Sequence, residues 1–161
     1  MIEDKIKNLS SLKKIVTRIK KQDKTIVFTN GCFDILHLGH IKYLEEAKKQ
    51  GDILIVAVNS DSSVRKIKPG RPINKELDRQ KVLASLSSVD YVVLFNQETP
   101  LNLIKAIKPD ILIKGGDWKP DKVVGKNIVE CYGGKVKIIN YLKGYSTTNL
   151  LKKIIRKAKT K

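Results

Sequence analysis

The spacing of hydrophobic residues changes from segment to segment along the chain. Between residues 5 and 21 they recur at helical spacing, which predicts an amphipathic helix ahead of the first strand. The segment 52–59 is almost entirely apolar, as expected for a strand buried on both faces of a parallel sheet. The same reasoning predicts strands at 25–30, 52–59, 89–95, 110–114 and 135–140, helices at 38–50, 75–86, 100–107, 125–132 and 147–159, and a polar loop at 60–74.

Strands that alternate with helices at this spacing predict right-handed βαβ units. The expected fold class is α/β, a Rossmann-like doubly wound parallel sheet of about five strands with helices on both faces. We expect one domain over residues 1–161, with the N-terminal amphipathic helix of residues 1–22 packing on it.

Polar motifs follow four of the five predicted strands. Because parallel strands end at one edge of their sheet, and ligands bind there near the point where strand order reverses, these motifs are expected to meet in one cleft. They are Gly31–His40, Ser60–Arg71, Lys114–Asp117 and Ser146–Thr148.

The motif His37-Leu38-Gly39-His40 holds both histidines of the chain and opens a predicted helix. A helix N-terminus presents unpaired N–H groups and the positive end of a dipole, so it attracts phosphate. Imidazoles there can donate hydrogen bonds to phosphoryl oxygens, and the glycine lets a ligand approach the backbone. The chain has no GxGxxG after the first strand and no GxxxxGK[ST], so a different phosphate site is indicated.

Composition narrows the class of protein. The 161 residues are 41% hydrophobic, yet no apolar run approaches the ~20 residues that span a membrane. The N-terminus lacks the features of a signal peptide, so we expect a cytoplasmic protein with no membrane partner. The lysine-rich helix at 5–21 could also be a membrane-surface helix, but it lacks Trp and Phe, and packing on the domain is favoured.

The net charge of +17 invites a nucleic-acid interpretation. However, 28 of the 33 basic residues are lysines spread through every segment, as on a solvated surface. The favoured prediction is therefore no nucleic-acid partner, with Arg65, Arg71 and Arg79 as candidate anion contacts.

Two cysteines make no disulfide framework. Cys32 could join His37 and His40 in a metal site, but a small turn residue is the favoured interpretation, and no metal site is predicted. Cys131 is expected to be a buried small hydrophobe.

Several motifs resemble those of one enzyme superfamily. Residues Phe28–His40 are similar to the first signature of the HxGH nucleotidyltransferases, in their cytidylyltransferase-like branch, and Ser146–Thr148 resembles the second. Three further features look like those of adenylyltransferases that act on D-glycero-β-D-manno-heptose 1-phosphate, in a stand-alone form without a kinase domain. These are Gly70–Ile73 with Asp78-Arg79, Lys114–Trp118, and Val124-Gly125 with Tyr132–Gly134.

The resemblance implies a reaction. AMP would pass from ATP, with Mg²⁺, to the heptose phosphate, giving ADP-heptose and pyrophosphate for lipopolysaccharide core or surface glycan synthesis. It also allows a homodimer. The competing hypotheses are a cytidylyltransferase acting on glycerol 3-phosphate or another small phosphate, a nucleic-acid-binding protein, and a catalytically silent nucleotide sensor.

The resemblance also implies residue roles. His37 and His40 would hold the α- and β-phosphate oxygens in the transition state. Asp34 could instead cap its turn, Ser146 or Thr147 could be an ordinary helix cap, and Lys42 could face either cleft or solvent. The implied catalytic residues are His37, His40, Lys68 (with Lys66 as its alternative), Ser146 and Thr147; the nucleotide-binding residues are Thr29, Asn30, Gly31, Cys32, Phe33, Lys114, Gly116, Asp117 and Thr148; and the acceptor-binding residues are Asp34, Lys42, Arg71 and Arg79.

Overall fold

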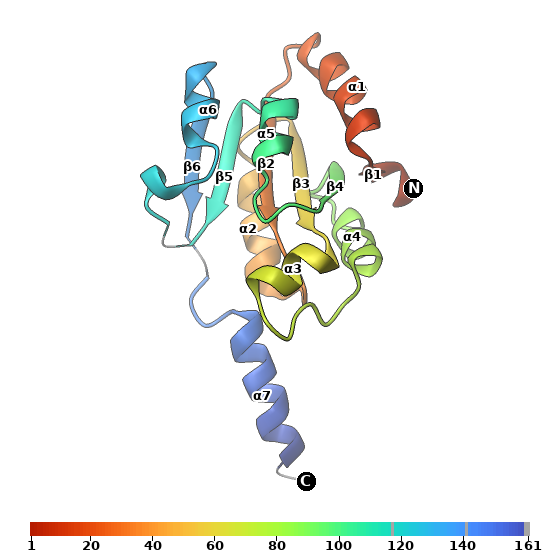
Figure 1. The fold of residues 1–161 in the computed structure, drawn as a ribbon, viewed down its shortest axis with the longest axis vertical. Coiled ribbons are helices and arrows are strands. Elements are labelled where there is room, and N and C mark those ends of the chain that lie inside the picture. The colour runs from red at the N-terminus through yellow and green to blue at the C-terminus, as the bar shows by residue number, and fades with distance from the viewer. Residues whose placement is uncertain (117, 141, 160–161) are drawn as a thin grey trace.

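A computed structural model describes residues 1–116, 118–140 and 142–159. Over these ranges, six strands form one sheet in the order β1-β4-β3-β2-β5-β6, and every neighbouring pair is parallel. The predicted α/β class with a doubly wound parallel sheet is therefore confirmed (Figure 1). The strands are β1 (Ile6–Lys7), β2 (Ile26–Gly31), β3 (Ile53–Asn59), β4 (Tyr91–Phe95), β5 (Ile111–Gly115) and β6 (Lys135–Ile139).

Strand β2 lies at the centre and pairs with β3 on one side and β5 on the other. The chain builds outward from β2 through β3 to β4, then returns to β5 and continues outward to β6. The order of strands thus reverses beside β2. A crevice for ligands is expected there, at the carboxyl ends of the strands.

Helices cover both faces of the sheet because side chains alternate along each strand. Ile26 and Phe28 pack with α1 (Leu9–Lys20), α5 (Leu101–Ile107) and α6 (Lys126–Cys131), whereas Val27 packs with α2 (Leu38–Lys48) and α4 (Glu76–Ala84). This agrees with two buried faces and explains the nearly continuous apolar sequence of β3. The other helices are α3 (Asp61–Ile67) and α7 (Thr147–Lys159), with 3-10 turns η1 (Glu3–Lys5) and η2 (Pro120–Lys122).

The sequence pattern predicted a helix from residue 5, where the structure has β1, and that prediction was wrong. The side chain of Asn8 accepts a hydrogen bond from the Ser11 amide at 2.8 Å, so α1 begins only at Leu9. Ile6 and Lys7, just before this cap, are extended and pair with β4 at the edge of the sheet. This pairing accounts for the sixth strand.

Helix α3 lies inside the segment predicted to be a loop. The Ser60 side chain caps it by accepting from the Ser63 amide at 3.2 Å, and Val64 is its buried apolar residue. A helix this short, with so little buried surface, leaves no periodic hydrophobic signal.

Cys131 is exposed rather than buried, because α6 turns Val129 toward the core instead.

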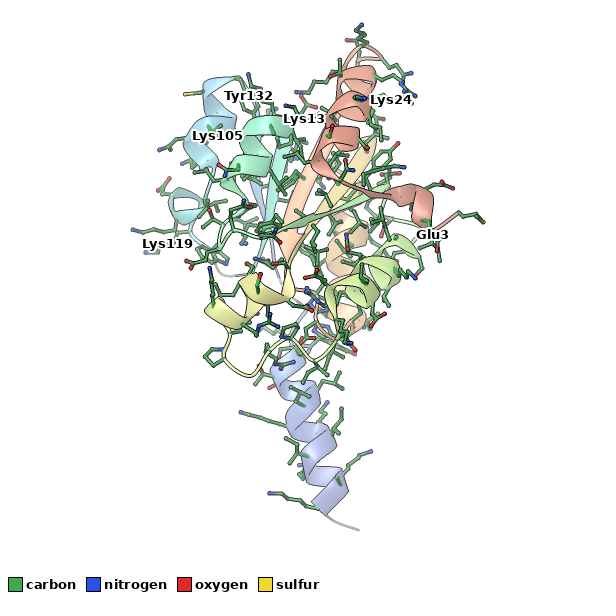
Figure 2. All side chains as sticks on the ribbon, turned by 45° about the vertical axis from the view of Figure 1, so that its right-hand side comes forward. Glu3, Lys13, Lys24, Lys105, Lys119 and Tyr132 are labelled. Atoms are coloured by element: carbon green, nitrogen blue, oxygen red, sulfur yellow. The ribbon has the colours of Figure 1, made fainter. Side chains whose placement is uncertain are left out.

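Helix α7 stands away from the rest of the fold in Figure 1, and none of its residues is buried. No helix in the described ranges combines the length and the apolarity needed to cross a lipid bilayer. The lysines labelled in Figure 2 come from different parts of the chain, with Lys13 on α1, Lys105 on α5, and Lys24 and Lys119 outside the helices.

Candidate active site

The turn after β2 brings the first histidine motif to the crevice. Phe33 has a φ of 46°, in the left-handed region that bulky residues rarely adopt. Its ring folds back over Gly31, where an added Cβ would lie 2.9 Å from the Phe33 ring. The ring also lies against His40, with centroids 5.4 Å apart. The small residue at 31 therefore permits a tight turn that leads directly into α2.

The two histidines lie face to face at the start of α2. Their ring centroids are 3.9 Å apart with an interplanar angle of 24°. The Nδ1 atoms of both rings are buried and have no hydrogen-bond partner among the described residues. Buried polar atoms in native proteins are usually hydrogen-bonded. The orphaned nitrogens therefore indicate a site shaped for a polar ligand.

Burial keeps both imidazoles neutral. It lowers the pKa of His40 to about 4, with smaller contributions from His37 and Lys68. Burial also lowers the pKa of His37. Each ring therefore carries one N–H donor near neutral pH.

Gly39 lies where the segments of the two sequence signatures come into contact. A Cβ at this position would lie 3.0 Å from the Tyr145 Cβ and 3.0 Å from the His37 Nδ1. The segment leading to Ser146 and Thr147 thus reaches the histidine pair only because residue 39 has no side chain. The Ser146 hydroxyl accepts from the Asn149 amide at 3.1 Å, which is the ordinary capping role that the sequence left open.

Asp34 organises the loop before α4. Its Oδ2 accepts from Arg71 Nη1 at 2.8 Å, and its Oδ1 accepts from the amides of Ile73 and Asn74 at 2.8 and 2.9 Å. Burial raises the pKa of the Asp34 carboxyl, but these hydrogen bonds outweigh it and hold the pKa below its usual value. Asp34 and Arg71 thus form an ion pair, in which the carboxylate neutralises the charge of the guanidinium.

Arg79 lies inside the protein. Its side chain has no exposed surface, and its donors reach three backbone carbonyls: Nη1 to Cys32 at 2.6 Å, Nη2 to Asn59 at 2.8 Å and Nε to Asn74 at 3.0 Å. Nη2 also lies 2.8 Å from Asp61 Oδ1. The expectation that Arg79 contacts phosphate does not fit this placement. Its guanidinium instead fixes the turn after β2 to the segments that follow β3.

Two lysines from other elements lie near the turn after β2: Lys114 beside Asn30, and Lys68 close enough for its charge to lower the pKa of His40. Lys114, at the end of β5, donates to Asn30 Oδ1 at 3.3 Å, and its Nζ lies 5.5 Å from the Trp118 ring centroid. Burial lowers the pKa of Lys114, and the charge of Lys68 lowers it further. Because Lys68 acts on both Lys114 and His40, the structure favours Lys68 over its alternative Lys66 as the cation at the site.

Other predicted residues lie elsewhere. Thr29 is buried and its hydroxyl is 2.6 Å from the Tyr43 hydroxyl, so it supports the strand beneath the site. Lys42 points outward and pairs with Glu45 at 2.8 Å. Gly116 donates its amide to the Ile139 carbonyl at 3.0 Å. The predicted Asp117 lies outside the described residues, and Thr148 is exposed in the first turn of α7.

Sequence reasoning missed three residues that shape the site. Asn74 donates its side-chain amide to the Asp34 carbonyl at 2.6 Å. Tyr43 lies three residues after His40, on the same helix face, which is a spacing that could have identified it. Tyr145 packs on Gly39 and immediately precedes the second signature, but no periodic pattern distinguishes it.

The described residues contain no cluster of three or more His, Cys, Asp or Glu side chains able to hold a metal ion. What these elements bring together is a glycine turn, two neutral imidazoles at a helix N-terminus and two lysines. Such a set can hold several phosphate oxygens and donate hydrogen bonds to them.

Comparison with known proteins agrees with this geometry. The chain is 52% identical over 153 residues to the bifunctional protein HldE of Geobacter metallireducens, and 52% identical over 150 residues to that of Aliarcobacter butzleri. These matches cover 94% and 92% of this chain, but the chain spans only 31% of the length of each relative.

Solved structures give the same picture. A lipopolysaccharide core biosynthesis protein from Thermoplasma volcanium is 38% identical, with a TM-score of 0.62, over 76% of this chain and 99% of that one. A pantoate-beta-alanine ligase from Francisella tularensis, at 18% identity and a TM-score of 0.61 over 94% of this chain and 78% of that one, shares the fold. The cytidylyltransferase-like family matches residues 28–156. The chain therefore belongs to the cytidylyltransferase-like family of nucleotidyltransferases.

Proposed function

We propose that this protein transfers AMP from ATP to D-glycero-β-D-manno-heptose 1-phosphate, giving ADP-heptose and pyrophosphate for lipopolysaccharide core or surface glycan synthesis. The observation that carries this proposal is the stacked pair of neutral imidazoles, with buried and unpartnered Nδ1 atoms, at the N-terminus of α2. The similarity to HldE proteins and to a lipopolysaccharide core biosynthesis protein supports the choice of acceptor.

The reaction needs no covalent bond to the protein. An oxygen of the sugar phosphate attacks the α-phosphorus of ATP, and the bond from that phosphorus to the bridging oxygen of the β-phosphate breaks. Pyrophosphate leaves with the electron pair of that bond. Catalysis then consists of aligning the two phosphates and stabilising the charge on the oxygens around the α-phosphorus.

His37 and His40 would donate to those oxygens. Because burial lowers both pKa values, each ring enters the reaction neutral, with a single N–H to offer. Charge that develops on the phosphoryl oxygens strengthens these hydrogen bonds in the transition state. The positive end of the α2 dipole adds to the same effect, and Lys68 and Lys114 would offset the charge of the triphosphate.

Mg²⁺ would enter as part of the substrate, bound to the triphosphate. Asp34, the carboxylate that the family resemblance places near the phosphates, already accepts three hydrogen bonds, one of them from Arg71. It therefore does not present a free carboxylate to a metal ion. In our account Asp34 holds the loop that bears Arg71, and that loop borders the acceptor.

The alternative in the same family is a cytidylyltransferase that acts on glycerol 3-phosphate. The nucleic-acid hypothesis stays the non-enzymatic alternative, and its support is the net charge of +17 alone. A homodimer and a cytoplasmic location stay predictions from the sequence.

The test is pyrophosphate release from defined substrate pairs. ATP with the heptose 1-phosphate is compared with CTP and glycerol 3-phosphate, and with both crossed pairs. The proposal predicts release that requires ATP and the heptose phosphate together. Turnover only with CTP or glycerol 3-phosphate would replace the substrates but keep the site, and no turnover with any pair would contradict the proposed reaction.

A further inference from the structure

Helix α7 carries an apolar stripe that the fold does not cover. Leu150, Leu151, Ile154, Ile155 and Ala158 recur at helical spacing and fall on one side of the helix. Ile154 and Ile155 are 53% and 54% exposed. Exposed large apolar side chains that gather on one face mark an interaction surface.

The first helix provides a contrast. Helix α1 is also amphipathic and lysine-rich, but Leu12, Val16 and Ile19 on its apolar side are buried against the sheet. The packing of α1 is therefore accounted for by the fold, whereas none of the residues of α7 is buried.

The charge of α7 has one sign. Its opposite face carries Lys152, Lys153, Arg156, Lys157 and Lys159, and no Asp or Glu occurs between residues 142 and 159. Exposed Leu142, Lys143 and Tyr145 extend the same mixture of apolar and basic side chains toward the domain. The helix thus offers an apolar stripe bordered by cations.

This combination selects among partners. A second copy of α7 would cover the stripe but would bring two strongly basic helices together. Nucleic acid would match the charge but would leave the apolar stripe in water. A narrow acidic groove on a protein would take the stripe but not the apolar and basic residues that precede the helix. A flat anionic lipid surface accommodates all of them, with a tyrosine near the interface.

We propose that α7 lies on anionic lipid surfaces, with its apolar stripe inserted among the acyl chains and its lysines at the headgroups. The sequence analysis considered a membrane-surface role for the first helix, whereas our proposal assigns that role to the last one. The proposal does not depend on the adenylyl transfer reaction, and it concerns attachment to a surface rather than passage across the bilayer.

The test is co-sedimentation of the full chain with vesicles of phosphatidylcholine alone or mixed with phosphatidylglycerol, at physiological salt. Binding is expected only to the mixed vesicles. The variant I154Q/I155Q keeps the charge and the helix propensity but interrupts the stripe at its two isoleucines, and its affinity should fall on the order of tenfold or more. K152Q/K153Q should weaken binding by a similar factor, since each lysine near an anionic surface contributes about 1 kcal/mol, or roughly fivefold.

The matched control is K13Q/K14Q on α1, which removes the same charge from a helix whose apolar side is already buried. Its affinity should change much less than that of the α7 variants. The proposal is overturned if the wild-type chain does not sediment with anionic vesicles, or if I154Q/I155Q binds as well as wild type. It is also overturned if light scattering shows a dimer that I154Q/I155Q converts to monomers, because α7 would then cover a second copy.

Discussion

Acidification should destabilise this protein through His40. The folded protein holds the pKa of His40 at about 4, below its ordinary value of 6.5. Between these two values the unfolded chain binds more protons than the folded chain, so stability falls as the pH drops through this window. Above pH 6.5 the contribution of the neutral ring is fully present.

The size of the effect follows from the same two values. Linkage between pKa values of 6.5 and about 4 gives a loss of roughly 2 kcal/mol between about pH 7 and about pH 5. Because the ring is only partly buried, screening by water reduces this to about 1–2 kcal/mol. The carboxyl of Asp34 does not contribute in this window, since its pKa lies below the usual value.

Urea unfolding of the wild type and of His40→Gln at both pH values isolates the effect. The wild type should lose about 1–2 kcal/mol more than the variant on acidification. Proton NMR measures the pKa of His40 directly, because the chain has two histidines and the variant assigns their signals. A His40 titration near 6.5, or an equal loss in both proteins, would refute the argument that burial holds this ring neutral.

Three other substitutions test the surrounding contacts. Arg79→Lys should lower the free energy of unfolding by about 3 kcal/mol, because it leaves buried carbonyls unpaired. A decrease below about 1 kcal/mol in urea unfolding would contradict the buried role of Arg79. Asp34→Asn should lower kcat/KM on the order of tenfold or more by releasing Arg71, and unchanged kinetics would remove Asp34 from the account. Gly39→Ala should lower kcat on the order of tenfold or more because its Cβ meets Tyr145, and a wild-type kcat would show that this contact does not position the site.

The order of the main elements could be read from the sequence because long periodic segments report burial directly. The central strands are examples. The periodic spacing also predicted the range 147–159 of α7, although no residue of that helix is buried. The misplaced elements, β1 and α3, are short, and each depends on a capping side chain or an edge pairing rather than on a periodic pattern.

The candidate site shows a similar division. The histidine motif and the lysine after β5 could be placed near phosphate because the topology brings strand ends together. The buried position of Arg79 could not be predicted, because an arginine that binds backbone carbonyls and one that binds phosphate have the same sequence pattern. The ion pair of Asp34 with Arg71 joins residues 37 positions apart, and no local rule predicts it.

The most direct test of the central claim is steady-state AMP transfer by His37→Ala and His40→Ala, with ATP and the heptose 1-phosphate. Lys49→Ala, on the exposed side at the end of the same helix, is the matched control. If the stacked imidazoles donate to the transition state, each histidine variant should lose on the order of 10² or more in kcat, while the control stays near wild type. Histidine variants that remain folded and turn over near the wild-type rate would contradict the account.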